Sequence, residues 1–171
     1  MDYLRKQNIL VKDVDGMHPC SEVLYRFRDI KPNPYNLSCT PLAVLKMVKH
    51  YNIDITHKHA VIVGRSSIVG LPLINGFLED HYKMTLTSPH ITDPDLSRHT
   101  KKADLIIVAA GQESLIKPDM IKEGAILIDI GINRVPSTKT KSGFRLVGDI
   151  DEKVCGLEYF YLYLLMALLV L

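Results

Sequence analysis

The chain has 171 residues, of which 47% are hydrophobic and 23% are charged, a composition typical of a folded globular protein. Its 21 basic and 19 acidic residues are interspersed and give a net charge of +2. There is therefore no basic face that would indicate binding to nucleic acid, and no acidic tail. The length suffices for one well-packed domain and is short for two.

Cysteine and histidine patterns argue against metal or disulfide chemistry. Cys20, Cys39 and Cys155 lack C-x-x-C spacing, which disfavours a zinc site or a disulfide framework and indicates a reducing compartment. The seven histidines are scattered without helical spacing beside a carboxylate, so we expect no metal. The amino terminus has neither a secretory signal nor the character of a transit peptide. We expect a cytoplasmic protein, or a mitochondrial one if a transit segment precedes these residues.

The first third of the chain contains one turn and one well-marked helix. Residues 1–11 should form a helix or strand, and the acids with a glycine in DVDG at residues 13–16 usually form a turn. Residues 21–36 read as a helix followed by a loop. The sequence SCTP at residues 38–41 opens a new helix, with Thr40 as N-cap and Pro41 at the first helical position, that continues to Tyr51.

Residues 59–63 (HAVIV) are apolar without polar alternation, which is typical of a strand covered on both faces. A turn of small residues follows, and residues 71–82 can form a helix. Gly64 allows a tight turn, Ser66 and Gly70 keep bulk away from a pyrophosphate, and the first N–H groups of the helix face the anion. This unit begins a nucleotide-binding βαβ fold. Because Ser66 and Val69 replace glycines of G-x-G-x-x-G, a purely structural junction remains the alternative.

Further strands are expected at residues 84–87, 105–110 and 125–130, with a short helix at residues 96–102. Two of these strands end at Gly111 and Gly131, as the first ends at Gly64. Three buried strands that end in glycine predict the carboxyl edge of one parallel sheet. The expected fold is therefore α/β and Rossmann-like, with a mostly parallel sheet and helices on both faces. Residues 136–143 have hairpin-loop composition, and residues 147–151 should form a last short strand.

Five motifs in a fixed order resemble one family: DVDG, SCTP, VGRSSIVGLP at residues 63–72, IKEGAILIDIGINR at residues 121–134, and VGDID at residues 147–151. Together they resemble the methylenetetrahydrofolate dehydrogenase/methenyltetrahydrofolate cyclohydrolase family over residues 12–153. The resemblance implies NAD(P)-dependent oxidation of 5,10-methylenetetrahydrofolate to 5,10-methenyltetrahydrofolate, and hydrolysis of that product to 10-formyltetrahydrofolate. It also implies a homodimer.

The resemblance implies a site as well. The substrate-binding residue is Asp15, which would contact the pterin of tetrahydrofolate; the cofactor-binding residues are Gly64, Arg65 and Ser66 at the phosphates and Thr40 and Ile132 at the nicotinamide end.

NADP is the expected cofactor, with NAD as the alternative. The second expected strand has no acid near its end, where an NAD-selective site has one. Arg65 could pair with a 2′-phosphate, or it could simply lie in an exposed loop. Ile91 stands where the family has a serine that helps to hold this phosphate, so we expect the preference for NADP over NAD to be weak.

The catalytic residue stays unassigned. In the family, the proton-handling lysine belongs to a tyrosine-x-x-x-lysine pair in a substrate-binding lobe before DVDG, and residues 1–12 contain no similar segment. The cyclohydrolase step needs acid–base help and should be impaired, whereas hydride transfer chiefly needs orientation. The alternative is a catalytically inert, nucleotide-binding relic or a partner subunit of a full-length enzyme.

The end of the chain departs from the family. Residues 159–171 are thirteen consecutive apolar or aromatic residues, too few for a membrane span, which needs about 20. We expect a non-native tail that is helical if ordered and that promotes self-association. The expected division is a remnant of the folate-binding lobe at residues 1–37, an NAD(P)-binding Rossmann-like domain at residues 38–156, and the tail at residues 157–171.

Overall fold

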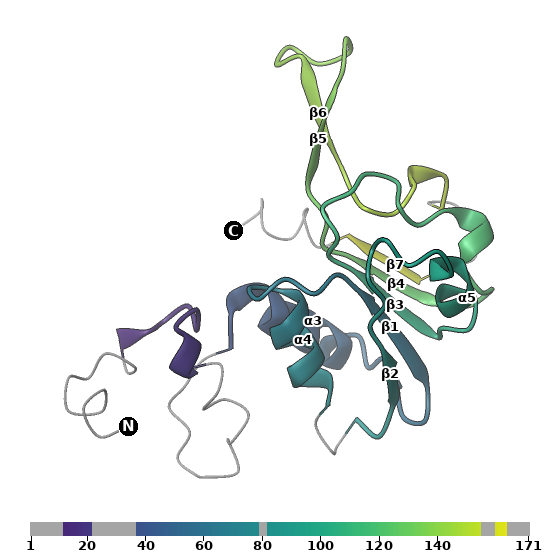
Figure 1. Ribbon diagram of the computed structural model, residues 1–171. Coiled ribbons are helices and arrows are strands. Elements are labelled where there is room, and N and C mark those ends of the chain that lie inside the picture. The colour runs from purple at the N-terminus through teal and green to yellow at the C-terminus, as the bar shows by residue number, and fades with distance from the viewer. Residues whose placement is uncertain (1–11, 22–36, 79–81, 155–159, 164–171) are drawn as a thin grey trace.

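The computed structural model describes residues 12–21, 37–78, 82–154 and 160–163, and it shows a five-stranded parallel sheet (Figure 1). The strand order is β2-β1-β3-β4-β7, and every neighbouring pair is parallel. The strands are β1 (His59–Val63), β2 (Thr85–Thr87), β3 (Leu105–Val108), β4 (Ile126–Asp129) and β7 (Phe160–Tyr163). This topology confirms the predicted Rossmann-like fold and the four strands expected from the sequence, each within one or two residues of its predicted bounds.

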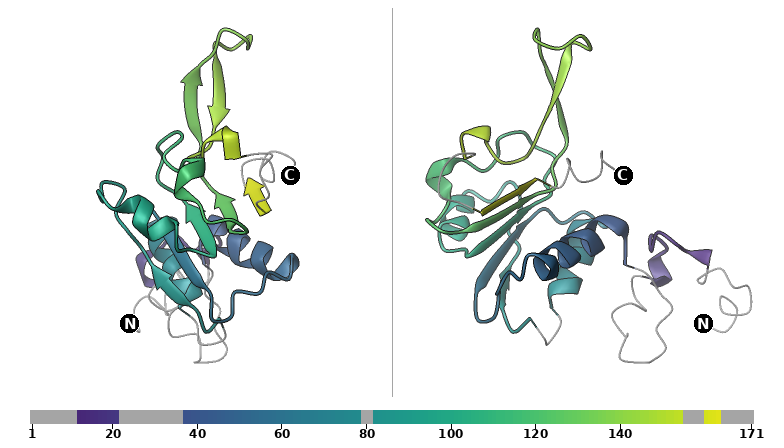
Figure 2. Two further views of the ribbon diagram at one scale, coloured as in Figure 1. Left: turned by 90° about the vertical axis from the view of Figure 1, so that its right-hand side faces the viewer. Right: turned by 180° about the vertical axis from the view of Figure 1, so that it is seen from behind.

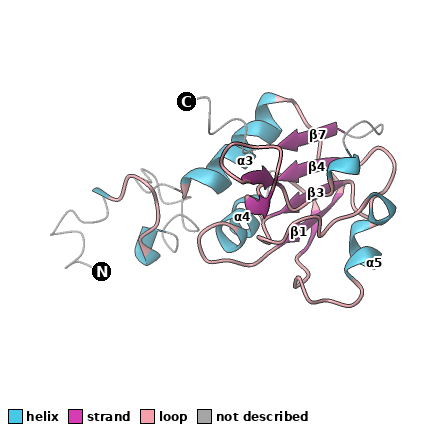
Figure 3. Cartoon of the chain, turned by 90° about the horizontal axis from the view of Figure 1, so that it is seen from above, coloured by secondary structure: helices cyan, strands magenta, loops and turns pink. Residues whose placement is uncertain are grey.

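Two hydrophobic clusters, one on each face of the sheet, explain why the strands lack polar alternation. Successive side chains of a strand point to opposite faces, so Ala60 and Ile62 of β1 enter one cluster while Val61 and Val63 enter the other. The first face is covered by α3 (Cys39–His50) and α4 (Gly70–Phe77). The second is covered by α5 (Leu96–Thr100), η2 (Pro118–Met120) and η3 (Glu152–Val154) (Figures 2 and 3).

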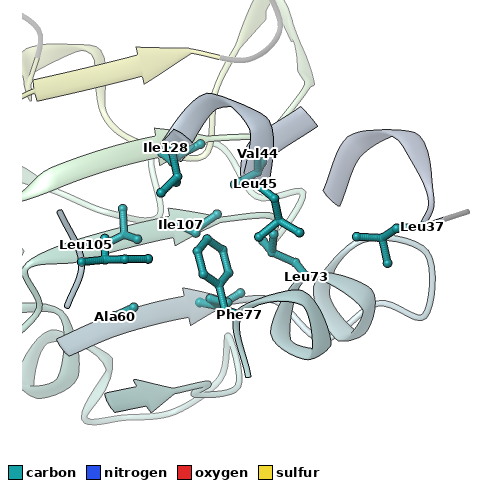
Figure 4. Close-up of a cluster of buried hydrophobic side chains, with 12 residues drawn as sticks. Leu37, Val44, Leu45, Ala60, Leu73, Phe77, Leu105, Ile107 and Ile128 are labelled. Carbon is teal, nitrogen blue, oxygen red and sulfur yellow. The ribbon is translucent and has the colours of Figure 1, made fainter. Parts of the chain in front are cut away.

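Helices α3 and α4 pack closely over the first face. Figure 4 shows Leu45 of α3 beside Leu73 of α4, and Val44 of α3 near Ile128 of the sheet. A Cβ atom at Gly76 would lie 2.7 Å from Cδ1 of Leu45. This glycine therefore lets the two helices approach, despite its cost of about 1 kcal/mol within a helix.

The start of α3 differs from the prediction. The N-cap is Ser38, not Thr40, and Thr40 lies inside the first turn. Pro41 is the third helical residue rather than the first. The helix accommodates it there because the N–H groups of the first turn have no partner within the helix, so proline's missing N–H costs no helical bond. The hydroxyl of Ser38 caps nothing in α3, because it donates instead to the carbonyl of Ile68 at 2.9 Å.

Two further boundaries were predicted wrongly. Helix α4 begins at Gly70 and ends at Phe77, short of Tyr82, with residues 79–81 outside the described part of the chain. The expected strand at residues 147–151 is absent: β6 (Phe144–Val147) ends where it was to begin. Residues 149 and 150 instead donate their N–H groups to the carboxylate of Asp129.

A two-stranded antiparallel hairpin leaves the domain between β4 and η3. Strand β5 (Asn133–Pro136) pairs with β6, and Figures 1 and 2 show the hairpin projecting beyond the sheet. The turn lies in the polar segment that was predicted to be a hairpin loop. That prediction is confirmed.

The expectation of a helical tail is wrong for residues 160–163. They form β7, which pairs in parallel register with β4, from Ile126 opposite Phe160 to Asp129 opposite Tyr163. Pairing with a preformed strand satisfies the backbone groups of an apolar segment, and aromatic residues favour strands. The expected elements at residues 1–11, and most of the one at residues 21–36, lie outside the described residues, as do residues 164–171.

We therefore predict that deleting residues 160–171 lowers the free energy of unfolding by about 2 kcal/mol or more, because β4 loses its backbone partners on one side. The matched control deletes residues 164–171 and retains β7. The midpoint of urea unfolding should fall in the first variant and stay closer to the wild-type value in the second. Equal midpoints for the longer deletion and the wild type would show that β7 adds nothing to the domain.

Candidate cofactor-binding edge

The turn after β1 is built by two glycines. Gly64 has φ +112°, a conformation unfavourable to other residues, and a Cβ atom there would lie 2.2 Å from the carbonyl oxygen of Ala109. A Cβ atom at Gly70 would lie 2.3 Å from the carbonyl oxygen of Gly64. The chain thus returns upon itself at the carboxyl edge of the sheet, and the tight turn predicted at Gly64 is confirmed.

Ser66 organises the turn from within. Its Oγ accepts the N–H groups of Val69 at 3.2 Å and Gly70 at 3.3 Å, and its carbonyl accepts the N–H of Leu71 at 2.9 Å. The side chain therefore acts as the cap of α4, whose N-cap position is the apolar Val69. This hydroxyl retains its proton for donation to a ligand.

Four backbone N–H groups of the same turn have no acceptor in the described part of the chain. Those of residues 65–68 donate to no other residue that the structure describes. Arg65 is exposed, and its guanidinium forms no hydrogen bond or ion pair within the described ranges. Free N–H groups at the start of a helix, beside a cation, form an anion-binding site.

The corresponding turn after β3 is occupied by a side chain of the protein itself. Oδ2 of Asp149 accepts the N–H groups of Ala110 at 2.6 Å and Gly111 at 3.0 Å. Oδ1 accepts the N–H of Gln112 at 3.0 Å and the side-chain amide of Asn133 at 2.8 Å. Successive N–H groups of this kind form an anion-binding nest. Because a carboxylate already fills this nest, a phosphate is excluded from it.

A second buried carboxylate supports the first. Asp129 at the end of β4 accepts the N–H groups of Gly131 at 2.8 Å, Asp149 at 3.1 Å and Ile150 at 2.9 Å. Burial raises the pKa of Asp129, and the nearby charge of Asp149 acts in the same direction, against these backbone hydrogen bonds. A Cβ atom at Gly131 would lie 2.2 Å from Cγ of Asp149, so glycine is required there for space.

Neither aspartate was assigned a role from the sequence. An acid at the end of the apolar run AILID, with a second acid in VGDID, was the available signal. A buried carboxylate needs several donors, but the donors of Asp149 in the turn after β3 lie 37–39 residues away along the chain. Nothing in the local pattern identifies them.

The remaining predicted residues lie around this edge. Ile132 follows β4 and is 53% exposed, at the same edge of the sheet as Gly64. Thr40 is half-buried in the first turn of α3, which the bond between Ser38 and the carbonyl of Ile68 ties to the glycine turn. Gly64, Arg65 and Ser66 are thus brought together in one turn, while Thr40 lies at the start of α3 and Ile132 follows β4.

Asp15 lies in a turn that the neighbouring acid stabilises. Asp13 accepts the N–H groups of Met17 at 3.2 Å and His18 at 3.1 Å, whereas Asp15 is exposed and accepts the N–H of Met17 at 3.3 Å. No hydrogen bond within the described residues joins Asp15 to the glycine turn. The two segments nevertheless border one cavity of about 270 Å³, lined by Gly16, Met17, Pro19, Ser38, Ser67, Ile68 and Pro72.

The described part of the chain contains neither a metal-binding cluster nor a membrane-spanning helix. Those residues contain no group of three His, Cys, Asp or Glu side chains that could hold a metal ion. Among them, too, no helix has the length and apolar character that crossing a membrane requires.

A parallel sheet with a glycine turn and free N–H groups at its carboxyl edge defines a Rossmann-type nucleotide-binding domain. The sequence model of the tetrahydrofolate dehydrogenase/cyclohydrolase family, NAD(P)-binding domain, matches residues 38–159. The chain belongs to this family, as the five sequence motifs predicted.

Comparison with individual sequences and solved structures supports the same family. The chain is 46% identical over 142 residues to the bifunctional protein FolD of Chloroherpeton thalassium, covering 82% of this chain and 48% of the relative. Campylobacter jejuni FolD, a methylenetetrahydrofolate dehydrogenase/cyclohydrolase, superposes with a TM-score of 0.77 at 42% identity, over 95% of this chain and 54% of that one. Trypanosoma brucei FolD, solved with NADP and an inhibitor, gives 0.79 at 30% identity, over 90% and 51%. The chain spans about half the length of these relatives.

Proposed function

We propose that the chain binds NADP at the turn of residues 64–70 and serves the NAD(P)-dependent oxidation of 5,10-methylenetetrahydrofolate. The observation that carries this proposal is the set of four unpaired N–H groups beside the exposed Arg65. Such a set suits a pyrophosphate, and the two glycines keep the backbone clear for it. The NADP bound to the Trypanosoma brucei relative is consistent with this choice.

Each predicted residue would contact a different part of the cofactor. Gly64 and Ser66 would hold the pyrophosphate, with the serine hydroxyl as a further donor. The guanidinium of Arg65 would pair with the 2′-phosphate in bidentate fashion. Ile132 and Thr40 would lie at the nicotinamide end, which is supported by their separate positions at the edge of the sheet and at the adjoining start of α3.

Asp15 would bind the pterin of the folate. Its exposed carboxylate can accept paired hydrogen bonds from an amino-pyrimidinone edge. The cavity of about 270 Å³ between residues 16–19 and residues 67–68 supports this placement, because it brings the folate turn beside the cofactor turn. The described residues would then orient the two reactants toward each other.

The two steps, oxidation and hydrolysis, require different contributions from the protein. The bound nicotinamide supplies the hydride acceptor, so oxidation needs chiefly orientation by residues such as Ile132 and Asp15. Hydrolysis of the methenyl product needs a general acid–base group, and these 171 residues contain no segment like the family's tyrosine-x-x-x-lysine pair. We propose that the cyclohydrolase step is impaired in this polypeptide. Residues 1–37 would belong to the folate-binding lobe and residues 38–156 to the cofactor domain, whose sheet also includes β7 from the expected tail at residues 157–171.

The proposed assembly is a homodimer. The projecting hairpin offers Phe144, 54% exposed, and Leu146, 44% exposed, as apolar side chains on β6. Exposed apolar groups on a projecting element favour association. A partner subunit from a longer relative is the alternative occupant, which would make this chain a binding component rather than an enzyme.

Substitution of Arg65 tests the choice of cofactor. Arg65→Ala should weaken NADP binding about tenfold, as expected for loss of a charge-assisted contact worth about 1.4 kcal/mol. NAD, which lacks the 2′-phosphate, should lose about twofold or less by the same reasoning. Calorimetric titration of both cofactors measures this difference, with Arg98→Ala, an exposed arginine of α5, as the matched control. Equal losses for NADP and NAD would show that Arg65 contacts the shared pyrophosphate, or nothing.

Turnover distinguishes the enzyme from the inert alternative. With 5,10-methylenetetrahydrofolate and NADP, we expect the 171-residue chain to bind the cofactor but to form little or no reduced nicotinamide, measured by its absorbance. The reason is that Asp15 is the single folate contact we propose, and holding the folate in a reactive orientation would need further folate-binding residues. A rate within the ordinary enzymatic range, about 1–10³ per second, would refute the proposed need for further folate-binding residues. Absence of NADP binding would refute the cofactor proposal itself.

A further inference from the structure

Asp149 is a buried carboxylate whose hydrogen-bond donors within the described residues are all neutral. Its side chain has no exposed surface, and it accepts three backbone N–H groups and the amide of Asn133. Within the described residues it forms no ion pair. Burying such a charge is costly unless donors replace the lost water, so all four contacts contribute to keeping it in place.

These contacts join two loops of the cofactor edge. Residues 110–112 follow β3, and Asn133 begins β5 directly after the exposed Ile132. Gly131, between β4 and Ile132, lies so close to the carboxylate that a Cβ atom would overlap it. The carboxylate therefore sets the distance between the ends of two neighbouring parallel strands, and with it the position of the segment that carries Ile132.

Asp149 itself is held by the protein on its other side. Its own N–H and that of Ile150 donate to Asp129 at the end of β4. The carboxylate is thus fixed from the strand below it and fixes the two loops above it. Rigid support of this kind decides how precisely a binding loop is placed.

We propose that Asp149 is a positioning residue for the nicotinamide half of the cofactor. It acts by holding residues 110–112 and 131–133 in the arrangement that the ring requires, without touching the cofactor. This role rests on the proposed NADP binding. It is separate from the phosphate contacts, because no N–H group of the open turn at residues 64–70 donates to Asp149.

The test compares NADP with 2′,5′-ADP, which carries the adenosine phosphates but no nicotinamide. In Asp149→Asn, an amide NH₂ replaces one carboxylate oxygen, so up to two of the four donors lose their acceptor. We expect NADP to bind about tenfold more weakly, a change equivalent to about 1.4 kcal/mol. The affinity for 2′,5′-ADP should stay within about twofold of the wild-type value, since its contacts lie at the other turn.

Hydrogen exchange without any ligand gives an independent readout. The amides of residues 110–112 should exchange faster in Asp149→Asn, while those of β1 should keep their wild-type rates. The matched control is Asp151→Asn, two residues away, where the carboxylate accepts the N–H of Lys153 at 2.9 Å and, within the described residues, accepts no hydrogen bond from residues 110–112 or 131–133. This control should bind both ligands as the wild type does.

Several results would contradict the positioning role of Asp149. Equal weakening of NADP and 2′,5′-ADP in Asp149→Asn would show a general structural role and overturn the positioning proposal, as would unchanged affinity for NADP. If Asp149→Asn does not fold, Asn133→Ala removes one of the four donors to Asp149, together with the amide's bonds to the carbonyls of Val147 and Gly148. It should weaken NADP alone; no selective loss would again overturn the proposal. A wild-type chain that binds 2′,5′-ADP but not NADP would overturn it too, whereas binding of neither ligand would refute the proposed function on which it rests.

Discussion

Close approach of backbone to backbone at the carboxyl edge of the sheet governs the architecture of this domain. A side chain at Gly64 would collide with the carbonyl of Ala109, and one at Gly70 would collide with the carbonyl of Gly64. At Gly131, the group that fills the space is the carboxylate of Asp149. Glycine is therefore required at Gly64 and Gly70 by a nearby backbone carbonyl and at Gly131 by a nearby side chain. The sequence does not distinguish these reasons, because each glycine simply follows an apolar run or a turn.

The carboxyl edge, as far as the structure describes it, contains two sets of backbone N–H groups, of which one is free and the other is bonded. The set at residues 65–68 is free within the described chain, and the set at residues 110–112 is saturated by Asp149. Both geometries suit an anion. Since only one of them remains open among the described residues, the turn after β1 is the proposed phosphate site, whereas Asp149 holds the protein's own loops at the other.

Much of the fold could be predicted because its signals are local. The run HAVIV predicted a doubly covered strand, and the turn after it predicted the first βα unit; both are present. Prediction failed where a distant partner decides the outcome. Ser38 is the N-cap of α3 while its hydroxyl bonds Ile68, thirty residues away. Residues 160–163, whose apolar run is equally compatible with a helix, pair with β4.

The candidate site shows the same limit. The motif around Gly64 and Ser66 identified the open turn from the sequence alone, because glycine and small residues directly after a buried strand are typical of a nucleotide-binding turn. Asp129 and Asp149 lie inside the family motifs, yet their roles depend on donors that only the folded chain brings to them. The sequence therefore predicted this edge of the sheet, and the structure shows which backbone groups Asp129 and Asp149 bind there.

Whether the turn after β1 or the turn after β3 binds phosphate is tested most directly by an NMR titration of the ¹⁵N-labelled chain with inorganic pyrophosphate. We expect the amide resonances of residues 65–68 to shift in a saturable manner, because their N–H groups are free to donate to the anion. The amides of residues 110–112 should not shift, because Asp149 already accepts them. Shifts confined to residues 110–112, or no saturable shift at residues 65–68, would contradict the assignment of the open turn as the phosphate site.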